Sequence, residues 1–199
     1  MIKANYKKYI LNFKNPSGTS RGILRTKETW FIILTENGKI GVGETGLFRG
    51  LSIDDISNYE DKLIWVCNNI DLGLENLLKA LYEFPSIQFG LEQAFLSLEQ
   101  ENSFVLFPSQ FTEGSDAIPI NGLVWMGDVE FMQDQIDSKI QAGFSTIKIK
   151  IGALAFNKEL ALIEKIRARY NARQITIRVD ANGAFSPYEV EEILLQLKR

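Results

Sequence analysis

A strand-like segment followed by a helix-like segment occurs three times in succession in the second half of the chain. The strand-like segments are apolar runs at Ile118–Val124, Thr146–Ile151 and Ile175–Ala181. The helix-like segments follow them at 129–140, which ends at Gly143, at 157–170, and from Ser186-Pro187 onward. Consecutive βα units predict a parallel sheet with right-handed crossovers. The periodicity is typical both of a doubly wound sheet and of a (β/α)₈ barrel, and it does not distinguish them.

The first half has a different pattern, typical of an α+β domain. A strand is expected at residues 2–13, and a hairpin at 30–43 around Asn37-Gly38, which is a strong two-residue turn signal. Three helical patterns follow; the first is expected to open at Ser52 and the third to run from about 86 to 101. The irregular segment Phe104–Ala117 suits a domain boundary. We therefore expect two domains, over residues 1–105 and 106–199.

Composition excludes several classes of function. The net charge is −3, which gives no electrostatic basis for binding nucleic acid, and no apolar run is long enough to span a membrane. The chain has no histidine, so it cannot use Ser-His-Asp catalysis or an HExxH zinc site. Its single cysteine, Cys67, lies in a helical apolar pattern and is expected to be structural. A cytoplasmic location is the default expectation.

Two of the strand-like segments carry charged side chains at alternate positions. In the second, the isoleucines share one face and Lys148 and Lys150 share the other, because side chains alternate along a strand. In the third, Arg178 and Asp180 likewise lie opposite the apolar residues. A parallel sheet is normally apolar on both faces. The charged faces are therefore expected to meet in a barrel interior or a crevice, although a strand with this pattern, taken alone, more often has one solvated face.

Such a cluster is suited to removing a proton from carbon. Lysines two positions apart on a strand lie roughly 6–7 Å from each other. Their mutual repulsion and partial burial favour the neutral amine, which can act as a base. Asp180 falls at the carboxyl end of its strand, where a carboxylate can bind Mg²⁺. The metal ion would stabilise the enolate that the lysine generates.

One motif in the first half invites a different interpretation. Residues 41–46 fit the GxGxxG pattern of dinucleotide-binding loops. That function requires a helix opening at the third glycine within a βαβ unit. Here the preceding strand belongs to an antiparallel hairpin, so we expect the glycines and Glu44 to be structural or to form a flap over a neighbouring site.

Five segments along the chain carry a family resemblance. They are Gly41-Val42-Gly43-Glu44, Phe89–Ala94, Pro119–Gly127, Lys148-Ile149-Lys150 and Asp180-Ala181-Asn182. Together they resemble the enolase superfamily, specifically its lysine-based muconate-lactonizing-enzyme subgroup. The first two match the family's capping domain, and the last two match its KxK strand and its DxN metal motif. The remaining segment is most similar to the o-succinylbenzoate synthase family.

The resemblance implies a fold, a reaction and residue roles. The fold would be an α+β capping domain followed by the first three βα units of a (β/α)-barrel. Lys150 would abstract the proton alpha to a substrate carboxylate, supported by Lys148, and Asp180 would bind Mg²⁺. Arg178 and Asn182 would orient the substrate. The activity implied is that of a carbon–oxygen lyase, by syn-dehydration of a cyclohexadiene carboxylate in menaquinone biosynthesis. Dipeptide epimerases and N-acylamino acid racemases use the same lysines and are the alternative.

The chain departs from the family in the extent of its barrel. The family's barrel has seven or eight strands, whereas three are expected here, without the other acidic metal ligands or the lysine of the opposite face. We therefore expect the 199-residue chain to have no independent activity. A further chain or segment would complete the barrel. The competing hypothesis is a non-catalytic partner or remnant.

Overall fold

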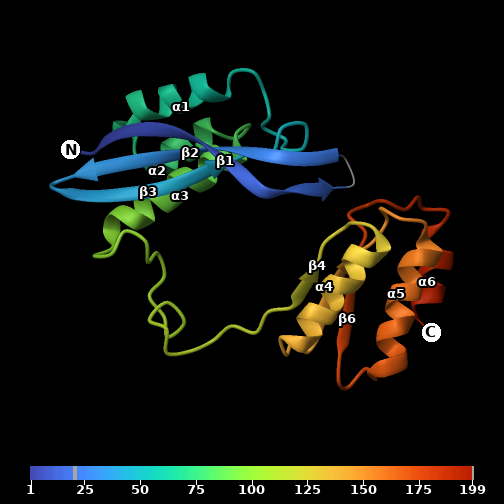
Figure 1. Ribbon diagram of the computed structural model, residues 1–199. Helices are drawn as coiled ribbons and strands as arrows, with labels where there is room; N and C mark the ends of the chain where they lie inside the picture. The colour runs from blue at the N-terminus through green and yellow to red at the C-terminus, as the bar shows by residue number, and fades with distance from the viewer. Residues whose placement is uncertain (20–21, 199) are drawn as a thin grey trace. The chain divides into compact units, whose positions relative to one another are not determined.

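The computed structural model describes residues 1–19 and 22–198, and Figure 1 shows their arrangement. The chain forms two compact units. One consists of Met1–Asn15 and Arg25–Ala117, and the other of Pro16–Leu24 and Ile118–Arg199. The expected irregular segment Phe104–Ala117 contains neither a helix nor a strand.

The first unit contains three α-helices and an antiparallel sheet, except for the strand ends within Pro16–Leu24. Its elements are β1 (Lys3–Thr19), β2 (Gly22–Glu36), β3 (Lys39–Gly46), α1 (Tyr59–Asn68), the 3₁₀ turn η1 (Ile70–Leu72), α2 (Leu74–Ala80) and α3 (Pro85–Glu99). The strands lie in the order β1-β2-β3. The turn between β2 and β3 has positive φ at both Asn37 (51°) and Gly38 (82°), with Glu36 paired to Lys39. The predicted hairpin is therefore confirmed, although β1 and β2 are longer than expected.

The predicted start of the first helix was wrong. Helix α1 begins at Tyr59, not at Ser52, and the intervening residues form turns. The buried Asp54 carboxylate accepts hydrogen bonds from the backbone N–H (2.8 Å) and the Oγ (2.6 Å) of Ser86, in the first turn of α3. The acidic residue that looked like part of a local helix start thus serves a helix 32 residues away.

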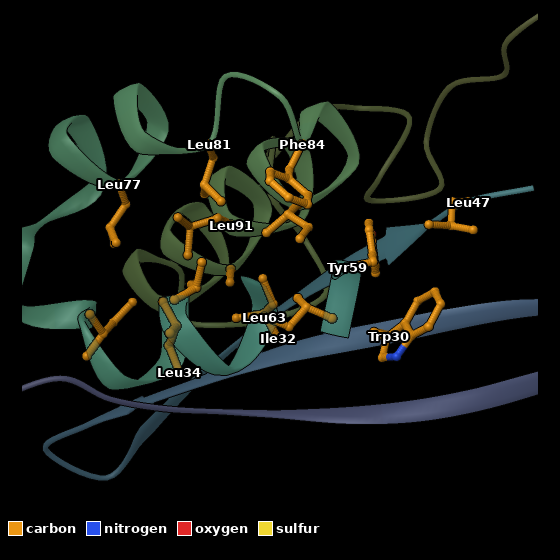
Figure 2. Close-up of a cluster of buried hydrophobic side chains, with 14 of the residues drawn as sticks. Trp30, Ile32, Leu34, Leu47, Tyr59, Leu63, Leu77, Leu81, Phe84 and Leu91 are labelled. Carbon is orange, nitrogen blue, oxygen red and sulfur yellow. The ribbon is translucent and has the colours of Figure 1, made fainter. Parts of the chain in front are cut away.

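The core of this unit lies between the sheet and the helices. Figure 2 shows Trp30, Ile32 and Leu34 of β2 facing Leu63 of α1 and Leu91 of α3. Helix α3 lies very close to β3. A Cβ at Gly43 would come 1.7 Å from the Gly90 carbonyl oxygen. Gly41 and Gly43, the first two glycines of the GxGxxG pattern, therefore allow α3 to pack on β3, which confirms the structural interpretation for these two positions.

The second unit contains three βα pairs. Its elements are β4 (Gly122–Val124), α4 (Val129–Gln141), β5 (Thr146–Lys150), α5 (Phe156–Arg169), β6 (Thr176–Asp180) and α6 (Val190–Leu197). The strands are parallel in the order β4-β5-β6. Strand β4 is shorter than predicted, and α6 begins at Val190 because Ser186–Glu189 form a turn in which the Glu189 carboxylate accepts from the Ser186 N–H and Oγ.

The isoleucine face of the parallel sheet is the core of this unit. Ile147 and Ile149 have 0% exposure and pack with Met132 and Ile136 of α4 and with apolar residues of α5. The helices thus cover the face opposite the lysines, as in a (β/α)-barrel. The predicted fold class, an α+β unit followed by three βα units, is confirmed. Within the described residues, no helix combines the length and the apolar character needed to cross a membrane.

Candidate active site

The charged face of the parallel sheet brings the predicted site residues together. Strands β5 and β6 are adjacent, with Lys148 opposite Arg178 and Lys150 opposite Asp180 in the register. Lys150 and Asp180 are the last residues of their strands, so both lie at the carboxyl end of the sheet. This is the edge at which parallel βα folds place their active sites.

The Asp180 carboxylate lies between the two lysines. The Nζ atoms of Lys148 and Lys150 are each 2.8 Å from Asp180 Oδ2, and the Asn182 backbone N–H donates to Oδ1 at 3.1 Å. The ammonium groups of Lys148 and Lys150, together with this N–H, hold the pKa of the Asp180 carboxyl well below its usual range. The two lysines thus share a counter-ion, which offsets the mutual repulsion expected from the sequence.

Lys150 is the more enclosed of the two lysines. Its side chain is 12% exposed, compared with 28% for Lys148. Lys150 Nζ also donates to Asn182 Oδ1 at 2.7 Å and lies 5.7 Å from the centre of the Trp125 ring. Asn182 itself has a φ of 48°, a left-handed conformation that asparagine tolerates better than most residues. These contacts with Asp180, Asn182 and the Trp125 ring therefore hold Lys150 Nζ at the carboxyl end of the sheet.

Arg178 is exposed and lies further back along β6. Its Nη1 donates to Asn121 Oδ1 at 3.3 Å. This face carries three cations (Lys148, Lys150 and Arg178) and one carboxylate, Asp180, so it favours an anionic ligand.

Sequence reasoning missed two residues of this face, Asn121 and Trp125. Leu123 of β4 pairs with Lys148, so the residues two positions before and after Leu123 share the lysine face. The alternation of side chains along β4 can be read from the sequence, but the register of β4 with β5 cannot. Trp125 is also fixed by its backbone, because Gln135 of α4 accepts from its N–H (2.9 Å) and donates to its carbonyl (3.0 Å).

Asp180 and Asn182 offer part of a metal site. Carboxylate and amide oxygens are the hard ligands that Mg²⁺ prefers, and Asp180 and Asn182 supply them at the strand end. Asp180 is the only carboxylate in the constellation just described, and the described residues contain no group of three His, Cys, Asp or Glu that could hold a metal ion. The chemistry of the donors fits part of the coordination shell of Mg²⁺, and the number of donors among the described residues does not fit a complete site.

Cys67 belongs to the first unit and takes part in none of the contacts described above. It is half-buried in α1, and burial raises the pKa of its thiol to about 11. A thiol with so high a pKa is a poor nucleophile at neutral pH, in agreement with the structural role predicted for it.

Comparisons with known proteins place this geometry in context. An o-succinylbenzoate synthase from Desulfotalea psychrophila is 36% identical over 232 aligned positions, which include 100% of this chain and 62% of the relative. The crystal structure of MenC from the same organism superimposes with a TM-score of 0.81 at 32% identity, over 99% of this chain and 61% of that one. No sequence profile of a known protein family matches the chain.

More distant structures share the fold. The o-succinylbenzoate synthase of Thermosynechococcus elongatus, solved with Mg in its active site, has a TM-score of 0.73 at 20% identity over 99% of this chain and 57% of that one. The L-Ala-D/L-Glu epimerase of Bacillus subtilis has a TM-score of 0.72 at 19% identity over 98% and 57%. The resemblance to the enolase superfamily is thus confirmed along the whole chain. The chain spans about three-fifths of the length of these relatives.

Proposed function

We propose that this chain is the part of an o-succinylbenzoate synthase-like lyase of the enolase superfamily that carries the proton-abstracting lysine and one Mg²⁺ ligand. The observation that supports this proposal is the cluster at the carboxyl ends of β5 and β6, where the Nζ atoms of Lys148 and Lys150 both lie 2.8 Å from Asp180 Oδ2. The 36% identity to a curated o-succinylbenzoate synthase supports the substrate class. The proposal includes a cytoplasmic location and a place in menaquinone biosynthesis.

Lys150 is the base in this proposal. Its amine takes the proton from the carbon next to the carboxylate of a cyclohexadiene substrate, leaving an enolate. The hydroxyl on the neighbouring carbon then departs, taking a proton from the Lys150 ammonium and leaving as water. Because one side chain handles both the proton and the leaving group, both depart from the same face of the ring. A syn-dehydration therefore matches a single enclosed lysine.

The remaining residues orient the substrate and balance its charge. Lys148 and Arg178 project from the same face of the sheet as Lys150 and supply positive charge for a carboxylate. Asn182 fixes Lys150 through its side chain and Asp180 through its N–H. Mg²⁺, held in part by Asp180, would stabilise the negative charge that develops on the substrate carboxylate.

Further polypeptide is needed to complete this site. Val179 on β6, an edge strand among the described strands, is 39% exposed, whereas Ile147 and Ile149 on the neighbouring strand are fully buried. A further βα unit beside β6 would bury this apolar side chain and could bring acidic residues to the charged face. We therefore propose that a continuation of the chain, or a second chain, supplies the rest of the barrel and of the metal site.

A dipeptide epimerase of the same subgroup is the alternative activity. It is favoured by the similarity of the fold to the epimerase from Bacillus subtilis. Epimerisation also begins with removal of a proton alpha to a carboxyl group, so the cluster on β5 and β6 serves either reaction. A non-catalytic role is the third possibility, and it predicts no turnover with any substrate.

The test uses a protein in which the barrel is complete. We define the completed protein as this chain joined at Arg199 to the remaining part of the Desulfotalea psychrophila relative. Its activity is measured with Mg²⁺ on the cyclohexadiene carboxylate, by the ultraviolet absorbance of the aromatic product, and on a panel of dipeptides, by loss of α-proton NMR signals in D₂O. We expect dehydration to be much faster than exchange on any dipeptide. Comparable rates, or turnover of dipeptides alone, would contradict the lyase assignment.

A further inference from the structure

A buried glutamate lies next to the strand that carries Lys150. Glu159, in the first turns of α5, has 0% exposure. Acidic side chains are almost never fully buried without a partner. Here the partners are backbone amides: the Gly152 N–H donates to both carboxylate oxygens at 2.9 Å, and the N–H groups of Ala153 and Leu154 donate to Oε1 at 3.1 and 2.9 Å.

These three consecutive amides form an anion-binding concavity that the chain fills with its own carboxylate. They belong to the loop between β5 and α5. The N-cap residue of α5, Ala155, has no side-chain oxygen that could cap the helix. The Glu159 carboxylate lies in the first turn of this helix. A negative charge near a helix N-terminus is favourable. Glu159 therefore fixes the loop that begins directly after Lys150.

The same loop is pressed against the loop that follows β6. Gly152 has a φ of +92°, and a Cβ there would lie 2.4 Å from the Cβ of Ala184. The Ile151 N–H donates to the Asp180 carbonyl at 3.0 Å. The rings of Phe156 and Phe185 meet edge to face, with centres 5.9 Å apart. Holding the first loop thus also sets the distance between Lys150 and the residues that bind it, Asp180 and Asn182.

We infer that Glu159 is a positioning residue for Lys150, acting by holding the β5–α5 loop through its backbone amides. The two lysines should depend on it unequally. Lys148 lies inside β5, where the strand hydrogen bonds hold it, whereas Lys150 is the last residue of the strand. The significance of this positioning for catalysis rests on the proposed role of Lys150 as the base, but the positioning itself is measurable without turnover.

The experiment compares the accessibility of the two lysines within one molecule. The full chain is labelled with a trace of acetic anhydride, and the ratio of Lys150 to Lys148 modification is read by mass spectrometry. Glu159→Gln keeps the shape of the side chain but removes its charge and turns an NH₂ toward the N–H groups. We expect the ratio to rise at least about fivefold, because charge-assisted hydrogen bonds are lost. An unchanged ratio in folded Glu159→Gln would overturn the inference.

Two variants in the same helix control for trivial effects. Glu164→Gln removes an exposed charge, and Ile166→Val trims a buried side chain and lowers stability without touching the loop. Both should keep the native ratio at a temperature where circular dichroism shows every variant folded. If Ile166→Val raises the ratio as much as Glu159→Gln does, Glu159 has a purely structural role and the inference is wrong.

A rescue experiment provides a second measurement. Glu159→Ala leaves room for a small carboxylate beside the three amides. Added acetate should restore slow hydrogen exchange of the Gly152, Ala153 and Leu154 amides and lower the labelling ratio, whereas chloride at equal ionic strength should do neither. Restoration by both salts would contradict a specific carboxylate site. Because none of these measurements uses turnover, an inactive completed protein would count against the proposed function and leave the positioning role standing.

Discussion

Asp180 is the residue on which the electrostatics of the site depend. Its carboxylate accepts from two ammonium groups and one backbone N–H, and this pairing holds its pKa below the usual range in the folded chain. In the unfolded chain an aspartate titrates near its ordinary pKa of about 3.9. Because the folded pKa is the lower of the two, Asp180 stabilises the fold fully above pH ~4 and loses this contribution as the pH falls below that value.

This difference between the folded and the unfolded pKa of Asp180 gives a prediction for Asp180→Asn. The variant leaves two ammonium groups without their counter-ion, so its free energy of unfolding should be lower than that of the native chain at pH 7. The difference should shrink as the pH falls below about 4, where Asp180 in the unfolded native chain becomes protonated. Urea unfolding between pH 2 and 7 measures this difference. If the difference in unfolding free energy stays constant down to pH 2, well below the ordinary pKa of ~4, the contacts of Asp180 with Lys148 and Lys150 do not stabilise the fold.

Asn182 combines a backbone role and a side-chain role. Its φ of 48° costs less for asparagine or glycine than for alanine, and its Oδ1 accepts from Lys150. Asn182→Ala should therefore lower the free energy of unfolding by about 1–2 kcal/mol. Asn182→Gly loses only the side-chain contact and should be less destabilising. Thermal unfolding of both variants tests this order, and equal losses would mean that the backbone conformation carries no strain.

At the scale of single elements, the contact between β3 and α3 is the most constrained in the first unit. Any side chain at Gly43 would collide with the backbone of Gly90, which cannot rotate away. Gly43→Ala should therefore cost more than about 2 kcal/mol of unfolding free energy. Val42→Ala, in the same strand but on its other face, should cost less. Denaturant unfolding compares the two variants, and a mild effect at Gly43 would mean that α3 can shift on the sheet.

The elements also show what the sequence could and could not predict. The hairpin at Asn37-Gly38 and the strands around Lys148 and Asp180 were predictable, because turn chemistry and side-chain alternation act over a few residues. The start of α1 was not, because Asp54 is used by Ser86 in a distant helix. The start of α6 is a separate case: Ser186 and Glu189 bond to each other locally, and the helix begins at the next residue, Val190.

The site follows the same division. The lysine pair and Asp180 were predictable from alternation combined with family motifs. Their shared contact at Asp180 Oδ2 depends on the register of β5 with β6, and the contribution of Trp125 depends on the register of β4 with β5. The contact between Glu159 and the three loop amides has no sequence motif of its own. A glutamate near the start of a helix is common in sequences, and Glu159 is unusual only because it is fully buried.

At the scale of the whole molecule, the parallel sheet presents an apolar edge. Val179 of β6 and Leu194 and Leu195 of α6 are exposed, and exposed edge strands promote association. The isolated chain should therefore self-associate with increasing concentration, as measured by sedimentation velocity. Leu195→Lys should weaken this association, whereas Ile53→Lys, at an exposed apolar position in the first unit, should not. If both variants self-associate to the same extent, the apolar edge formed by β6 and α6 is not the surface through which the chain associates.

The isolated chain is also expected to be inactive. It contributes one carboxylate to a metal site that needs several oxygen ligands. Assays of the isolated chain with Mg²⁺ should show no dehydration above the uncatalysed rate. Measurable turnover would show that these residues suffice without the rest of a barrel.

The central claim is that Lys150 is the base, and one substitution tests it most directly. In the completed protein, Lys150→Ala should reduce dehydration by at least about 10³-fold while Mg²⁺ binding, followed by calorimetry, is retained. Lys165→Ala, an exposed lysine on α5, is the matched control and should leave both unchanged. Near-native turnover by Lys150→Ala would contradict the account.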